Sequence, residues 1–348
     1  MQPVAKIGDV EYTSLQAAIN AAQAGETITL VANIDYVNVA SAADKTTTIN
    51  VPAGKKFTLD LNGYTISCQN NSNSSFAMMT ICSGADVTID DTSAGKAGKI
   101  SYTSTRDIAN ENHEGYTIRN KGALTLNGGT IENVTPLTSD GKEKCVTTAV
   151  DNCNSSGVVS TFTMNGGVVA SDSYFAVRSS VYANNTAATT SAIVALNGGT
   201  IYGLHFCDWG SKNLDYQVAI ANGVVVECGR YPELTDQSMR LAIASASTSN
   251  VAIDIAEEAQ IKGAIYGVAA KIGTKYYTKL AKAVDAVQAG ETLTLLKETT
   301  ETFVLPIGVI LKKNDGIEAA GVTVKQPAAK IGETNYATFA DALAAASA

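Results

Sequence analysis

The chain has 348 residues, of which 45% are hydrophobic, 17% charged and 6% aromatic, and its formal net charge is −8. This apolar content is enough for a large buried core. Nucleic acid and anionic membrane surfaces are excluded as partners, because positive charge is nowhere clustered. Membrane insertion is not expected either, because no apolar run approaches the ~18–20 residues of a membrane span.

The first predicted element is a strand–helix–strand unit at 4–30, "VAKIGDVEYTSLQAAINAAQAGETITL". Its middle part has apolar residues at i, i+3, i+4 and i+7, which predicts a short helix with one buried stripe. These positions are Leu15, Ala18, Ile19 and Ala22. Ser14 is expected to cap the start of this helix and Gly25 to supply a left-handed residue at its end.

A second, looser repeat follows, in which "LTLNGGTIEN" (124–133) returns as "FTMNGGVVAS" (162–171) and "VALNGGTIYG" (194–203). The corner positions of this repeat are Asn62, Asp90, Asn127, Asn165, Asn197 and Asn222. Asn-Gly between strands ordinarily signals a β-hairpin. One corner in every stretch of about 25–40 residues is instead typical of a solenoid, in which each coil covers its neighbour. We therefore favour a solenoid over stacked hairpins.

Aligning "TICSGADVTID" (80–90) with "TIRNKGALTLN" (117–127) without a gap predicts which side chains face inward. Alternation along the strands places four aliphatic side chains in the interior: Ile81, Ile118, Val150 and Val177. The residues two positions further on are expected to turn inward at a bend and form a hydrogen-bonded ladder. These residues are Ser83, Asn120, Asn152 and Ser179.

The strand–helix–strand unit of 4–30, hereafter the framing unit, returns near the C-terminus. It recurs in full at 269–295 and in its first half at 328–348, "AAKIGETNYATFADALAAASA". This predicts a first domain over 1–266, a small α+β repeat module over 267–327 and the truncated, helical start of a further repeat over 328–348. The N-terminus lacks a secretion signal pattern, and the last repeat stops part-way. We therefore expect a piece of a longer secreted chain.

The asparagine and serine ladder, the aliphatic stacks and the glycine corners resemble the right-handed parallel β-helix of the pectate-lyase-like superfamily. The framing unit is similar to repeats in cell-surface proteins of Gram-positive bacteria, notably gut commensals. This resemblance implies a mainly β fold, a right-handed parallel β-helix whose N-terminal helix closes the open end. It also implies an extracellular location at the cell surface or cell wall.

One column of this predicted helix could carry chemistry. The alignment places Cys82, Arg119, Asp151 and Arg178 in successive coils at the outward position before the ladder. Asp151 would then lie between two guanidinium groups on one exposed strip. Related lyases and hydrolases act on such a strip, so these three residues are candidates for glycan binding or catalysis, with the arginines holding sugar carboxylates. The alternative is an outer-face charge ladder with a purely structural role.

Other candidates are His205, Asp208 and Trp209, which lie in a predicted excursion at 203–216. The single tryptophan could stack on a sugar ring, or it could cover the core beneath a loop. Asp90 and Asp91 keep calcium open as a cofactor, although a tight turn with Asp at its corner explains them equally directly.

Cysteine spacing allows several interpretations. Six thiols permit 15 pairings. A disulfide between Cys145 and Cys153 within a polar loop is the favoured one, with buried thiols elsewhere. No other metal site is expected, since no CxxC occurs and the chain has two histidines.

The sequence therefore predicts an extracellular adhesin or ligand-binding protein that presents loops on a β-helix to a glycan or a host surface protein. These loops are expected at 101–116, 134–157, 183–192 and 203–216. The alternatives are a polysaccharide lyase or glycoside hydrolase, and a plain spacer. No catalytic fingerprint such as GxSxG or HExxH occurs, which favours a non-enzyme. The oligomeric state stays open.

Overall fold

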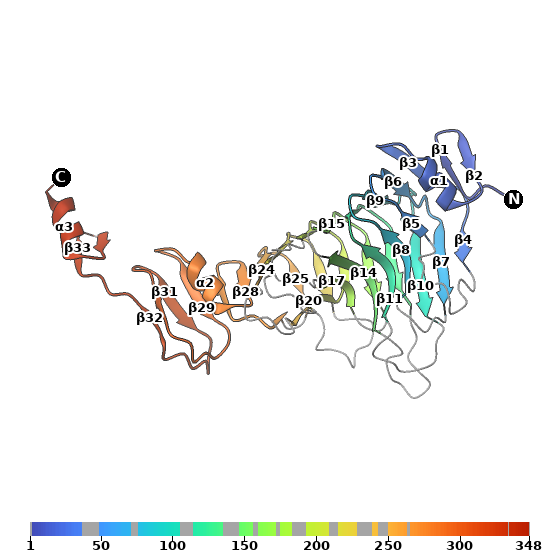
Figure 1. Cartoon of the computed structure of the whole chain (residues 1–348). Coiled ribbons are helices and arrows are strands. Elements are labelled where there is room, and N and C mark those ends of the chain that lie inside the picture. Colours follow the sequence, from blue (N-terminus) through green and yellow to red (C-terminus); the bar gives the residue numbers. More distant parts are fainter. Residues whose placement is uncertain are drawn as a thin grey trace, which may run out of the picture. The chain divides into compact units, whose positions relative to one another are not determined.

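The structure, a computed structural model, is mainly β and divides into two compact units (Figure 1). Unit 1 comprises Met1–Ser249 and Ala256–Tyr266, and unit 2 comprises Asn250–Ile255 and Gly267–Ala348. The residues that the structure describes are 2–36, 49–70, 76–104, 114–134, 146–155, 159–171, 175–182, 193–208, 215–227, 239–242, 250–262, 265–332 and 334–347.

Unit 1 winds through three sheets of parallel strands stacked in register, an arrangement consistent with a parallel β-helix. Sheet A contains β3 (Glu26–Leu30), β6 (Lys56–Asp60), β9 (Asp86–Asp90), β12 (Ala123–Leu126), β15 (Thr161–Met164), β18 (Ile193–Leu196) and β21 (Asp215–Ile220). Sheet B contains β4 (Ile34–Tyr36), β7 (Thr65–Asn70), β10 (Lys99–Ser104), β13 (Thr130–Asn133), β16 (Val168–Ser171), β19 (Thr200–Tyr202), β22 (Val225–Glu227) and β25 (Gln260–Ile261). Sheet C contains β5 (Ile49–Val51), β8 (Phe76–Ile81), β11 (Glu114–Asn120), β14 (Val146–Ser155), β17 (Phe175–Tyr182), β20 (Leu204–Asp208), β23 (Met239–Ala242) and β26 (Ile265–Tyr266).

The Asn-Gly corners separate sheets rather than close hairpins. The strands on either side of Asn127, β12 and β13, belong to sheets A and B, and each pairs in parallel with the coil before and after it. The solenoid interpretation is thus confirmed. Side chains along a strand alternate between the interior and the outer face of the coil. In sheet A, Leu124 and Leu126 are fully buried and Thr125 between them is partly exposed.

Four of the six predicted corners keep the predicted register and two do not. Asn165 Nδ2 donates to Asn127 Oδ1, and Asn197 Nδ2 to Asn165 Oδ1, both at 2.8 Å. Asp90 occupies the same slot, as predicted, because Asn127 N donates to the carbonyl of the residue before it, Ile89. In the coil before Asp90 the corner position is occupied by Asp60, which pairs with Asp90. In the coil after Asn197 it is occupied by Ala221, whose N–H donates to Leu196 O. The predicted corners Asn62 and Asn222 therefore lie beyond the slot.

The corner glycines are explained by close stacking of the coils. A Cβ added at Gly166 would lie 2.7 Å from the carbonyl oxygen of Asn127 in the preceding coil. At Gly167, whose φ is +80°, it would lie 2.5 Å from Gly129 O. Only glycine fits where two backbones approach this closely.

The ungapped alignment of 80–90 with 117–127 is wrong in sheet C by two residues. β8 pairs with β11 so that Thr80 lies opposite Arg119 and Ile81 opposite Asn120. Cys82 is therefore not in the arginine column, and Ser83 is exposed in a turn instead of turning inward. The alignment failed because the bend after β8, closed by Ala85 N donating to Cys82 O, is longer than the bend after β11.

In the N-terminal framing unit, β1 (Ala5–Ile7) pairs antiparallel with β2 (Val10–Tyr12) on one side and with β3 on the other. Helix α1 (Leu15–Ala21) begins at Ser14, whose side chain accepts a hydrogen bond from Ala17 N at 3.1 Å, as predicted. Its predicted apolar stripe is buried. Gly25 is left-handed, with φ +85°, but lies in the turn to β3 rather than at the helix end, because α1 stops earlier.

α1 also covers the edge of sheet C. The side-chain amide of Gln16 donates to Asn50 O at 2.8 Å and accepts from Asn50 N at 2.9 Å, so it replaces a neighbouring strand for β5. Lys55 Nζ donates to Asn20 O and Ala22 O at the other end of the helix. These bonds satisfy backbone groups that an open edge would leave exposed.

Unit 2 repeats the framing unit. Its elements are β24 (Asn250–Ile255), β27 (Ala270–Ile272), β28 (Lys275–Tyr277), α2 (Leu280–Ala286), β29 (Thr292–Leu295), β30 (Phe303–Leu305), β31 (Ile310–Lys313), β32 (Val322–Val324), β33 (Ala329–Ile331), β34 (Thr334–Tyr336) and α3 (Phe339–Ala346). Its core includes Leu280, Ala283, Leu293 and Leu295. Gly290, the equivalent of Gly25, has φ +89° and likewise lies beyond the helix, in the turn to β29.

Candidate functional site

Three neighbouring strands of sheet C bring the predicted charged residues together. The register of β11, β14 and β17 pairs Arg119 with Asp151 and Asp151 with Arg178. This juxtaposition agrees with the sequence alignment. Opposite charges on adjacent strands relieve the repulsion that two arginines in one column would cause.

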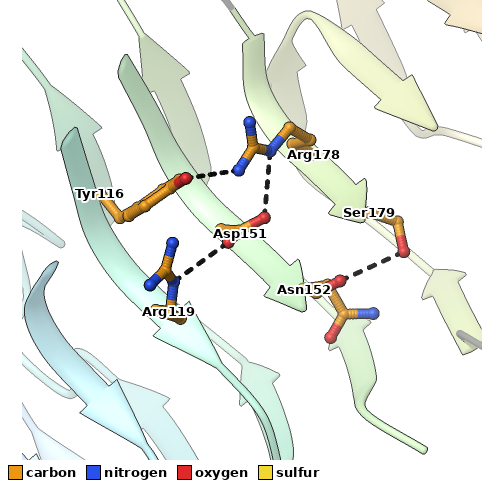
Figure 2. Close-up of polar contacts among 6 residues, drawn as sticks. All are labelled: Tyr116, Arg119, Asp151, Asn152, Arg178 and Ser179. Atoms are coloured by element: carbon orange, nitrogen blue, oxygen red, sulfur yellow. Dashed lines mark hydrogen bonds and ion pairs between the residues drawn. The ribbon is translucent and has the colours of Figure 1, made fainter. Parts of the chain in front are cut away.

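Asp151 binds both guanidinium groups (Figure 2). Arg119 Nε lies 3.3 Å from Asp151 Oδ2, and Arg178 Nε lies 3.1 Å from Asp151 Oδ1. One carboxylate therefore bridges three successive coils through charge-assisted hydrogen bonds.

Tyr116 completes the cluster, and sequence reasoning missed it. Arg178 donates a hydrogen bond from Nη2 to the Tyr116 hydroxyl at 2.6 Å. The guanidinium carbons of Arg119 and Arg178 lie 4.1 Å and 5.0 Å from the centroid of its ring, within the range of cation–π attraction. In Figure 2 the ring lies beside both arginines on the side of the sheet that carries Asp151.

Strict alternation would have put Tyr116 on the opposite face from Arg119, three residues later. The ladder pairs of β11 with β8 and β14 include Tyr116 and Ile118 but pass over Thr117. The Thr117 hydroxyl instead donates to Glu132 O in sheet B at 2.8 Å. This interruption brings both side chains to the same face, and no sequence pattern marks it.

The prediction of an exposed strip is wrong for two of the three charged residues. The side chains of Asp151 and Arg178 are 0% and 1% exposed, and only Arg119, at 23%, retains access to solvent. Burial lowers the pKa of Arg119, but Asp151, Tyr116 and Cys153 more than offset this, so its pKa is raised overall. The guanidinium of Arg119 is thus permanently charged.

The predicted polar ladder lies next to this cluster at the bend between sheets C and A. Asn120 Nδ2 donates to Asn152 Oδ1 and to Thr161 O, both at 2.8 Å, and Asn120 Oδ1 accepts from Gly122 N at 3.1 Å. Ser179 Oγ lies 3.4 Å from Asn152 O. All three ladder side chains are fully buried, as predicted, so the ladder fixes the bend from inside the coil.

The acidic corner formed by Asp60, Asp90 and Asp91 is a tight turn. Asp91 Oδ1 accepts from Gly63 N and Ser93 N, and its Oδ2 accepts from Gly98 N at 2.6 Å. Asp60 similarly accepts from Thr92 N and from the Thr92 hydroxyl. These carboxylates are satisfied by the chain itself, and within the described ranges no group of His, Cys, Asp and Glu could hold a metal ion.

The remaining candidates are only partly placed. Residues 204–208, expected in an excursion at 203–216, belong to β20, and His205 lies in register with Arg178. The side chains of His205 and Asp208, and the whole of Trp209, lie outside the described residues. So does Cys145, and the disulfide with Cys153 stays a prediction.

The predicted loops are also shorter than expected. The segment 101–116 contains the end of β10 and the start of β11, and 134–157 contains β14. The parts left between described strands are 105–113 and 135–145. The predicted loop at 183–192 lies wholly outside the described residues, between β17 and β18.

Comparison with known proteins finds no matching family model, no matching curated protein and no matching solved structure. In the part of the chain that the structure describes, no helix is long and apolar enough to span a membrane.

Proposed function

We propose that this chain is a non-enzymatic, extracellular ligand-binding solenoid, a cell-surface adhesin of the right-handed, pectate-lyase-like β-helix type. Its ligand is a glycan or a host surface protein. It takes no cofactor. The three stacked parallel sheets support this proposal. The right-handed winding, the pectate-lyase-like superfamily and the cell-surface location are part of the proposal itself.

The observation that carries it is the contrast between two corners of the coil. Between sheets A and B three successive corners are short and alike, with Asn127, Asn165 and Asn197 in one hydrogen-bonded column. Between sheets B and C, consecutive described strands are separated by stretches of different lengths that lie outside the described residues: 71–75, 105–113, 135–145 and 172–174. All of them start and end at the same corner of a rigid frame, which is how binding loops are usually presented.

The arginine cluster supports binding over catalysis. A general base must reach its substrate, and the Asp151 carboxylate is buried between two guanidiniums. Arg119 can contact a ligand through its exposed part without changing its protonation, because its pKa is raised. A sugar carboxylate or a protein carboxylate is the complementary group.

The experiment pairs a glycan array with a lyase assay that follows new unsaturated sugar ends by ultraviolet absorbance. Binding without turnover supports the proposal. Turnover supports the polysaccharide lyase or hydrolase instead. Neither binding nor turnover would indicate that the chain is a spacer.

Two variants localise the binding. Replacing 105–113 by a Gly-Ser linker of equal length should abolish binding, whereas the same replacement at 183–192, between sheets C and A, should leave it. Equal binding by both variants would remove the sheet B–sheet C corner as the recognition surface. Labelling of intact source cells with an antibody against the chain checks the surface location.

A further inference from the structure

The two complete framing units differ at one strand edge. In unit 2 the hairpin β27–β28 has β24 paired antiparallel to β28, with Ala252 opposite Tyr277 and Asp254 opposite Lys275. Ile255 N donates to Thr274 O at 3.1 Å, and Thr278 N to Val251 O at 3.2 Å. In unit 1 the equivalent strand β2 is the outermost strand of sheet A, and no described residue pairs with its free edge.

The exposure of equivalent side chains records this difference. Tyr277 of β28 is 6% exposed, whereas Tyr12, its equivalent in β2, is half-buried. Val10, the equivalent of Lys275, is 59% exposed. β2 thus keeps the sequence and hairpin of β28 but leaves an apolar residue on an open edge.

A matching open edge exists in unit 2. β31 is the outermost strand at the other end of that sheet. It is equivalent to β24, because the same turn follows both strands: Ala259 N donates to Ala256 O at 3.0 Å, and Ile317 N donates to Asn314 O at 3.1 Å. This equivalence places Ile310 at the position of Ala252 and Lys312 at that of Asp254.

We propose that β31 of one copy of this chain pairs antiparallel with β2 of a second copy, in the register that β24 and β28 use. Ile310 then lies opposite Tyr12, and Lys312 lies opposite Val10. Because each copy carries one edge of each kind, further copies can add in the same direction.

The backbone of β2 is arranged for such a partner. Tyr12 O accepts from Val4 N, so Tyr12 directs its backbone groups toward the hairpin side. Its neighbour Glu11 therefore directs its N–H and C=O toward the free edge, since direction alternates along a strand. The unpaired groups of an edge strand are a template for strand addition.

Charge favours this pairing over the alternatives. The β2 edge carries Asp9 and Glu11, and the β31 edge carries Lys312 and Lys313. In the proposed register Asp9 lies opposite Lys313, and Glu11 is its diagonal neighbour. Pairing of β2 with β2, or of β31 with β31, would bring like charges together, so the edges select each other.

Two exposed apolar side chains point to the same register. Ile310 is 50% exposed and Val10 is 59% exposed. They become diagonal neighbours on one face when Ile310 lies opposite Tyr12, so pairing removes apolar surface from water.

The test is sedimentation velocity of the full chain over a wide concentration range at low and high salt. We expect the weight-average sedimentation coefficient to rise with concentration at low salt and to rise less at high salt, because ions screen exposed charges. A coefficient that stays constant with concentration at low salt would overturn the proposal.

Two sets of variants identify the edges. Glu11→Pro removes the N–H that faces the free edge and should abolish the increase, while Asn335→Pro, at the equivalent position of β34, should leave it. The double variants Asp9→Lys/Glu11→Lys and Lys312→Glu/Lys313→Glu should each sediment as a single species, and their mixture should associate again, because each β2 edge then meets a β31 edge of opposite charge on the other variant. Loss of association with Asn335→Pro alone, or failure of the mixture to associate, would show that other surfaces are involved.

Discussion

Arg178 donates a hydrogen bond from Nε to Asp151 Oδ1 at 3.1 Å, and the two side chains are 1% and 0% exposed. Such a pair is stabilising only while both members are present, because a lone buried charge has lost its hydration without compensation. The Asp151–Arg178 pair therefore makes sheet C sensitive to the loss of a single carboxylate.

Replacing Asp151 by Asn should lower the free energy of unfolding by about 3–5 kcal/mol, because it removes the buried anion that both guanidiniums bind. Urea unfolding followed by circular dichroism measures this loss. The control is Asp86→Asn, which removes an exposed ion pair with Lys56 at 2.8 Å and should cost about 0–1 kcal/mol. Similar losses for both variants would contradict the burial of Asp151.

The Asn120 side chain should contribute more to the stability of the fold than that of Asn197, although each belongs to an asparagine ladder. Asn120→Ala leaves Gly122 N without its partner inside the coil, at about 1–3 kcal/mol for a buried group, and also removes the bonds to Asn152 and to Thr161 O. Asn197→Ala removes one exposed hydrogen bond and should change stability by within about 0.5 kcal/mol. Thermal unfolding of the two variants side by side provides the measurement, and a reversed order would place the structural ladder at the other corner.

Two bend glycines should respond differently to the same substitution. Gly84 has φ +78° with nothing near its missing Cβ, and asparagine tolerates this left-handed conformation, so Gly84→Asn should fold normally. A Cβ at Gly122 would lie 2.4 Å from Ala85 O and 2.6 Å from Cys82 O, both backbone atoms that cannot move aside. Gly122→Asn should therefore lose about 1–3 kcal/mol or more. Equal melting temperatures for the two variants would contradict the close stacking of these coils.

Asp91 should make stability depend on pH in the acid range. Burial raises its pKa, but hydrogen bonds from Ser93, Gly98 and Gly63 more than offset this, so the pKa is lowered overall. A carboxyl whose pKa is lower in the folded chain than the ordinary value of about 3.9 contributes stability above that value, and this contribution is lost as the pH falls toward the folded pKa.

The Asp91→Asn variant should therefore be less stable than the wild type at pH 7, and the difference should shrink as the pH falls below about 4. Urea midpoints at a series of pH values measure it. A difference that stays the same from neutral to acid pH would mean that the charge of Asp91 contributes nothing.

Much of the coil could be predicted because its signals are local and repeated. Alternation marked Ile118, Val150 and Val177 as interior, and all three are fully buried. The Asn-Gly corners marked the change of sheet. The ladder of Asn120, Asn152 and Ser179 followed from the same pattern, since alternation turns the small polar residue that ends each run into the interior at the bend.

The errors came where bends differ in length or where a side chain is covered by distant parts of the chain. The two-residue shift at Ile81 reflects a longer bend, and an ungapped alignment has no means to detect it. The burial of Arg178 depends on tertiary surroundings, so alternation identified its strand face but not its exposure. Tyr116 required knowledge of the interruption at Thr117, which appears only when the neighbouring strands are paired.

The column Asn127–Asn165–Asn197 has one further consequence, for the evolution of the chain. Because each of these residues meets the next coil through the same amide contact, duplication or deletion of one complete turn would recreate the same junction on both sides. Each such event would change the length of the tube by about 4.8 Å, the spacing of neighbouring strands. Reach can therefore be adjusted in uniform increments while α1 and the first coils keep their own contacts.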